Sequence, residues 1–178
     1  LVDASGSSAL ERMNEAKGAV ELLLADCYSR RDEVALVAFR GQQAELLLPP
    51  TRSLTRVRRG LVALPGGGGT PLAAGLLLAQ DVARESVRRG RRVSLVLLTD
   101  GRANVPLEVG AGSARATEDA LACARALAAD RIPVLFIDTA RRPRREAREL
   151  AEALDARYLP LPYADANAVS GAVRALAG

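Results

Sequence analysis

Three oxygen-bearing side chains alternate near the start of the chain, in Asp3-Ala4-Ser5-Gly6-Ser7, directly after the apolar pair Leu1-Val2. Carboxylate and hydroxyl oxygens are the ligands that hard cations such as Mg²⁺ prefer, with water and a partner's oxygen filling the remaining positions. The same residue types also favour an ordinary helix cap, because Ser and Asp accept hydrogen bonds from the first backbone N–H groups of a helix. The motif alone therefore leaves a cation site and a cap as alternatives.

Two later segments carry further oxygen ligands at places where an element is expected to begin or end. Thr70 follows the run Gly66–Gly69, and Asp100 follows the apolar run Leu97-Leu98-Thr99. If Asp3 and Asp100 face each other, the two carboxylates repel, and a divalent ion removes that penalty. An ion with two acidic ligands and neutral hydroxyls keeps positive charge and open positions, which suits the capture of a partner's carboxylate.

The glycine run could instead hold a phosphate at a helix N-terminus. No Gly-x-x-x-x-Gly-Lys-Ser/Thr or Gly-x-Gly-x-x-Gly sequence occurs, and the only lysine is Lys17, so nucleotide binding is disfavoured. Asp3 could also be a nucleophile that accepts a phosphoryl group. Phosphatases of that kind have a second Asp two residues after the first. This chain has Ser5 at that position, so a phosphoryl-accepting role for Asp3 is disfavoured.

Composition restricts the class of protein. A length of 178 residues with 49% hydrophobic residues suits one domain with a sizeable core. Histidine is absent, which excludes Ser-His-Asp hydrolysis and His-ligated zinc within this chain. No apolar run is long enough to span a membrane and no signal peptide is visible, so we expect a cytoplasmic protein. Cys27 and Cys123 are the only cysteines, and we expect them to be reduced core residues.

The chain carries a net charge of +4, and its arginines cluster at 52–59, 84–92 and 141–148. A basic balance can indicate nucleic-acid binding. The clusters are separate and have no interleaved aromatics for base stacking. We therefore expect solvated helix faces, with an acidic protein partner as the next possibility, and no nucleic acid.

Strand-like and helix-like segments alternate along the chain. The hydrophobic pattern predicts strands at 1–2, 33–39, 44–48, 92–99, 132–138 and 156–159, and helices at 9–27, 53–61, 72–87, 116–129, 144–154 and 164–176. Pro49-Pro50 is expected to end the strand at 44–48, which could form an antiparallel edge with the preceding strand. The pattern predicts an α/β, doubly wound, mostly parallel sheet with helices on both faces. Ligands of such sheets bind at the carboxyl ends of the strands, where Asp3 and Asp100 are expected.

Together, Asp3, Ser5, Ser7, Thr70 and Asp100 resemble the metal-ion-dependent adhesion site of von Willebrand factor A (integrin I) domains. The resemblance implies Mg²⁺ or Mn²⁺ held by these five residues, the serines coordinating directly and the aspartates directly or through water. Gly101, Arg102 and Asn104 lie beside the site in sequence. They are either contacts to a partner at the rim of the site or an ordinary turn after the strand.

Longer stretches resemble the C-terminal domain of the D-subunit family of magnesium chelatases. The resemblance is specific from Leu1 to about Val105 and looser beyond, and the arginine-rich composition and Gly66 resemble the bacteriochlorophyll type. The stretches that carry it are Glu15–Val20, Arg31–Leu36, Ala38–Gly41, Ala44–Ser53, Leu64–Ala73 and Thr99–Val105.

That family inserts Mg²⁺ into protoporphyrin IX with ATP hydrolysis. The resemblance implies that residues 1–178 form a single domain at the C-terminal end of a longer AAA+-containing subunit that assembles into rings. It implies a non-catalytic module that recognises an acidic motif through its bound ion and couples two partners, the AAA+ ATPase subunit I and the large porphyrin-binding subunit; ATP is bound elsewhere. The alternatives are the equivalent domain of a cobaltochelatase or another AAA+ partner, a secreted adhesion domain, and a metal hydrolase.

Overall fold

The computed structural model describes residues 1–5, 24–64, 66–161, 171–172 and 175, and six strands among them form one sheet in the order β3-β2-β1-β4-β5-β6. Every neighbouring pair is parallel except β2 and β3, which are antiparallel at one edge. This confirms the predicted mostly parallel sheet. The strands are β1 (Val2–Asp3), β2 (Val34–Arg40), β3 (Gln43–Thr51), β4 (Leu95–Thr99), β5 (Val134–Asp138) and β6 (Arg157–Pro160).

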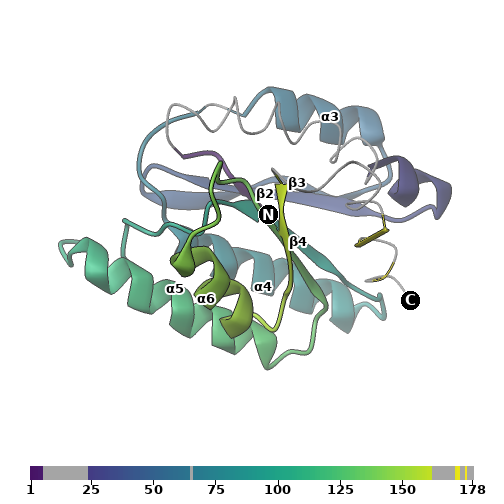
Figure 1. Ribbon diagram of the computed structural model, residues 1–178. Helices are drawn as coiled ribbons and strands as arrows, with labels where there is room; N and C mark the ends of the chain where they lie inside the picture. The colour runs from purple at the N-terminus through teal and green to yellow at the C-terminus, as the bar shows by residue number, and fades with distance from the viewer. Residues whose placement is uncertain (6–23, 65, 162–170, 173–174, 176–178) are drawn as a thin grey trace.

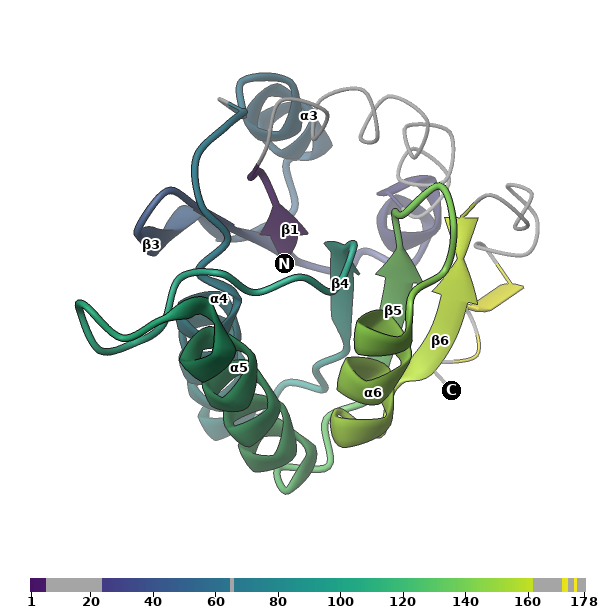
Figure 2. The same cartoon turned by 60° about the vertical axis from the view of Figure 1, so that its left-hand side comes forward.

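Helices cover both faces of the sheet, as the sequence predicted (Figure 1). They are α3 (Leu54–Val62), α4 (Leu72–Arg88), α5 (Ser113–Ala128) and α6 (Arg145–Ala153). Figure 2 shows α4, α5 and α6 on one side and α3 on the other. Successive strand residues therefore enter different cores: Phe136 packs with the side of α4 to α6, and its neighbours Leu135 and Ile137 pack with the side of α3. This two-sided burial explains why the central strands are continuous apolar runs.

Three predicted boundaries differ from the structure by three residues, each because pairing or capping decided the limit. Strand β3 continues through Pro49 and Pro50 to Thr51, because an edge strand needs backbone donors on one side only. Strand β4 begins at Leu95, because the register with β5 starts there, where Leu95 pairs with Val134, the first residue of β5. Helix α5 begins at Ser113, three residues before the predicted start, with Gly112 as its N-cap.

Two predicted helices, at 9–27 and 164–176, lie mostly outside the described residues. Residues 24–29 are helical, past the predicted end at Cys27. Within the described ranges, no helix combines the length and the hydropathy needed to cross a membrane.

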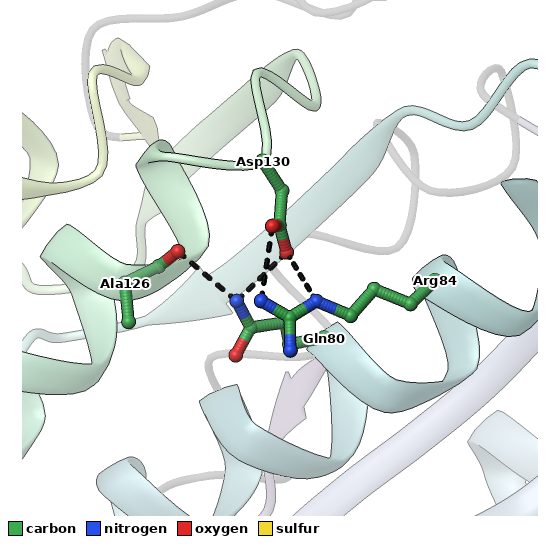
Figure 3. A network of polar contacts seen from close by, with 4 residues as sticks. All are labelled: Gln80, Arg84, Ala126 and Asp130. Carbon is green, nitrogen blue, oxygen red and sulfur yellow. Dashed lines mark hydrogen bonds and ion pairs between the residues drawn. The ribbon is translucent and has the colours of Figure 1, made fainter.

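A polar cluster joins α4 to the end of α5, near the amino end of β5 (Figure 3). The buried Gln80 amide donates to the Ala126 carbonyl at 3.0 Å and to Asp130 Oδ2 at 2.8 Å. Arg84 donates to both Asp130 oxygens, at 2.7 and 3.0 Å. These bonds from Arg84 and Gln80 lower the pKa of Asp130. The cluster fixes the two helices against each other, at the amino ends of the parallel strands.

Candidate metal centre

The carboxyl ends of β1 and β4 lie side by side, because Val2 pairs with Leu98 in parallel register. Asp3 ends β1 and is 7% exposed, and Asp100 follows β4 directly. Burial raises the pKa of Asp3, hydrogen bonds from Ser5 and Thr99 oppose that shift, and the negative charge of Asp100 adds to it. The carboxylates of Asp3 and Asp100 therefore interact electrostatically across the adjacent ends of β1 and β4.

Hydroxyl groups form a short chain that ends on the Asp3 carboxylate. Thr70 Oγ1 donates to Ser5 Oγ at 2.7 Å, and Ser5 Oγ donates to Asp3 Oδ1 at 2.6 Å. The Ser5 backbone N–H binds the same Asp3 oxygen at 2.9 Å, while Thr99 Oγ1 donates to Asp3 Oδ2 at 2.7 Å. All four residues are buried, so the group is held rigidly at the carboxyl ends of the central strands.

Thr70 reaches this group because the glycine loop before it packs closely. A Cβ on Gly69 would lie 2.5 Å from Val105 Cγ2 and 2.8 Å from the Gly41 carbonyl oxygen, so only glycine fits there. Asn104 then holds the threonine: its Oδ1 accepts from the Thr70 N–H at 2.7 Å, and its own N–H donates to the Thr70 carbonyl at 3.3 Å. The β4–α5 loop thus supports the glycine loop.

Of the five residues predicted for the site, Asp3, Ser5 and Thr70 lie in one hydrogen-bonded group, and Asp100 lies beside them at the next strand end. Asp100 Oδ1 also accepts from the Arg102 N–H at 3.1 Å. Ser7 lies outside the described residues. In the described part of the chain, no three His, Cys, Asp or Glu side chains gather as a metal-binding group, so a cation here would rely on hydroxyl oxygens and water. That donor set of two carboxylates and several hydroxyls fits a hard cation such as Mg²⁺.

Sequence reasoning missed two buried residues next to the site. Thr99 orients Asp3 and also accepts from the Gly101 N–H at 3.2 Å. Asp138 ends β5 opposite Thr99 in the register, accepts from the Ala140 N–H at 2.8 Å and from the Tyr158 hydroxyl, and has a pKa raised first by its burial. The signal for Asp138 was available, since it closes an apolar run in the same way as Asp3.

The sequence left two alternatives for Gly101, Arg102 and Asn104, which were contacts to a partner at the rim of the site or an ordinary turn after β4. In the structure, Gly101 and Asn104 have roles in packing and hydrogen bonding. Gly101 has φ of +78°, and a Cβ there would lie 2.6 Å from Ala147 Cα, so the glycine lets the turn pack against α6. Asn104 supports Thr70. Arg102 is exposed and remains available at the rim of the site.

Comparison with known proteins supports the resemblance noted from the sequence. The chain is 55% identical over 177 residues to the magnesium-chelatase 60 kDa subunit of Cereibacter sphaeroides, covering 99% of this chain and 32% of that protein. It is 44% identical over 179 residues to the magnesium-chelatase 67 kDa subunit of Chlorobaculum parvum, covering 95% and 29%. The chain thus spans about a third of the length of these curated relatives.

Solved structures share the fold. This chain superposes on part of the structure of three N-terminal domains of the pili tip protein Mfa5 from Porphyromonas gingivalis, with a TM-score of 0.76 at 12% identity, covering 94% of this chain and 47% of that one. At that identity the likeness concerns the fold alone. The family model for the von Willebrand factor type A domain matches residues 1–102, which include Asp3, Thr70 and Asp100. With the sheet order, the two-sided helices and this match in agreement, the chain belongs to the von Willebrand factor type A domain family.

Proposed function

We propose that this chain is the metal-dependent protein-interaction domain of a D-type subunit of magnesium chelatase. In this proposal the full subunit is cytoplasmic and takes part in inserting Mg²⁺ into protoporphyrin IX with ATP hydrolysis, in bacteriochlorophyll biosynthesis. Support comes from the two curated relatives named above, both magnesium-chelatase subunits. Their names favour magnesium over cobalt as the metal of the enzyme.

The observation that carries the proposal is the buried hydroxyl chain from Thr70 through Ser5 to Asp3, beside Asp100. Asp3, Ser5, Ser7, Thr70 and Asp100 would hold a resident Mg²⁺ or Mn²⁺. The bound ion would supply a positive charge with open positions for a carboxylate of a partner. It is a binding element of the protein, whereas the Mg²⁺ that the enzyme inserts is a substrate.

In this proposal, neighbouring residues of the chain hold the metal ligands in position. Thr99 fixes the orientation of the Asp3 carboxylate, and Asn104 fixes the backbone of Thr70. The oxygens are therefore pre-arranged, and little side-chain entropy remains to be lost when a cation and a partner bind. We assign the chain no catalytic residue. ATP binding and porphyrin binding belong to the rest of the assembly, with the AAA+ ATPase subunit and the porphyrin-binding subunit as partners.

Binding measurements with those two subunits test the proposal, in Mg²⁺ and in chelator. Asp100→Asn removes one carboxylate from the partly exposed edge of the site, and Asp81→Asn on the exposed side of α4 is the matched control. We expect wild type and Asp81→Asn to bind a partner only with Mg²⁺, and Asp100→Asn to bind no better with Mg²⁺ than with chelator. Binding that is indifferent to both chelator and Asp100→Asn contradicts the proposal.

A further inference from the structure

Four exposed arginines lie on two loops at the carboxyl ends of the strands, the same end of the sheet as the candidate metal centre. Arg102 is in the turn after β4, and the other three are in the loop between β5 and α6. We call the set the arginine rim: Arg102, Arg141, Arg142 and Arg144.

Packing brings the two loops together. The Thr139 N–H at the start of the β5–α6 loop donates to the Thr99 carbonyl at 3.0 Å. Gly101 lies against Ala147 in the first turns of α6, closely enough to exclude a Cβ. Figure 2 shows the β5–α6 loop leaving the sheet at the arrowhead of β5, on the same side as the arrowhead of β4. The rim therefore borders the strand ends that carry Asp3 and Asp100.

The charge of the rim is not compensated within the described part of the chain. None of its four guanidinium groups pairs there with a carboxylate, whereas the next arginine, Arg145, binds Glu149 at 2.6 Å. Arg148 lies over the Tyr158 ring, 5.5 Å from its centre. Exposed guanidinium groups next to a cation site attract negative charge, and their planar donors match carboxylates.

We propose that the arginine rim selects the partner of the metal centre: an acidic protein segment places one carboxylate at the metal and further carboxylates on the rim. This inference rests on the proposed function. Charge complementarity of this kind sets partner choice and association rate more than total affinity. An acidic protein segment is favoured over nucleic acid because residues 99–105 and 139–148 contain no aromatic side chain on which a base could stack.

The test uses the 178-residue chain and two fluorescent peptides of equal length, one with a single glutamate and one with four. Binding is followed by anisotropy in Mg²⁺. The rim variant is Arg141→Gln/Arg142→Gln/Arg144→Gln. It leaves Arg102 in place, because the backbone N–H of that residue binds Asp100.

The matched control removes the same charge from α3, which packs on the opposite face of the sheet: Arg56→Gln/Arg58→Gln/Arg59→Gln. These three arginines are also exposed. We expect the four-glutamate peptide to bind wild type about tenfold more tightly than the one-glutamate peptide, since each exposed pair adds a modest increment. The rim variant should lose this preference and the control should keep it. At 1 M salt the preference should shrink, because the screening length falls to about 3 Å.

Equal losses in the rim variant and the control would show a general effect of net charge and overturn the inference. A preference that survives in the rim variant also overturns it. A short oligothymidylate that binds more tightly than the acidic peptide, and does so through the rim, would assign the surface to nucleic acid instead. If chelator and Asp100→Asn leave peptide binding unchanged while the rim variant loses it, the rim stands as a site for acidic segments, whereas its link to the metal centre and the metal-dependent function fail. The two failures are therefore distinguishable.

Discussion

Thr99→Val tests whether the candidate centre is held together by the buried threonine. Valine has nearly the same shape, but it lacks the hydroxyl that donates to Asp3 Oδ2 at 2.7 Å and accepts from the Gly101 N–H at 3.2 Å. Thr99 is fully buried, so water cannot replace either bond. A hydrogen bond to a charged group contributes about 1.5–3 kcal/mol and a neutral one about 0.5–1.5 kcal/mol. The expected loss of unfolding free energy is about 3 kcal/mol.

Because a change of 1 kcal/mol moves the Tm of a domain of this size by about 2–4 °C, we expect a fall of about 9 °C. Far-UV circular dichroism is the suitable assay, on heating for the Tm and in urea for the free energy of unfolding, since the chain has no tryptophan. Thr139→Val is the control: Thr139 follows the neighbouring strand, and within the described residues its backbone N–H makes a hydrogen bond while its hydroxyl makes none. The control should stay within about 0.5 kcal/mol of wild type. Equal stability of the two variants would refute the reasoning.

Three further changes test other parts of the structure. Gly69→Ala forces a methyl group against Val105, and we expect a loss of about 1–3 kcal/mol in urea unfolding together with weaker Mg²⁺ binding by calorimetry. The bonds from Arg84 lower the pKa of Asp130 in the folded state, so their stabilisation is present above the unfolded pKa of about 3.9 and is lost as the pH falls through the folded value. Arg84→Met should therefore lose less stability than wild type between neutral pH and acid, measured by urea midpoints; an equal loss would contradict this. Tyr158→Phe removes the hydroxyl that binds the buried carboxylate of β5, and thermal unfolding should show a loss of about 1–3 kcal/mol, while an unchanged Tm would show that the bond contributes nothing.

Some features were predictable because they depend on neighbours in sequence. The alternation of strands and helices follows from local hydrophobic periods, and continuous apolar runs such as β5 indicate burial on both faces. Other features depend on pairing, which the sequence does not state. The two prolines in β3 were expected to end the strand, and they are accommodated because β3 lies at the edge of the sheet. Asn104 could not be identified as the support of Thr70, because the contact joins two loops 34 residues apart.

By itself, the sequence determined which residues can supply ligands and at which end of the sheet they lie, because polar residues that follow apolar strands of a parallel sheet must meet at one edge. It also placed glycine at 69, where no larger residue fits. Only the tertiary structure decided that Thr70 donates to Ser5, that Thr99 rather than a neighbouring residue orients Asp3, and that the arginine rim borders the same edge. The physical reason is that hydrogen bonds depend on distances of a few tenths of an ångström between atoms far apart in the chain, and these distances are set by the packing of the strands and loops around them.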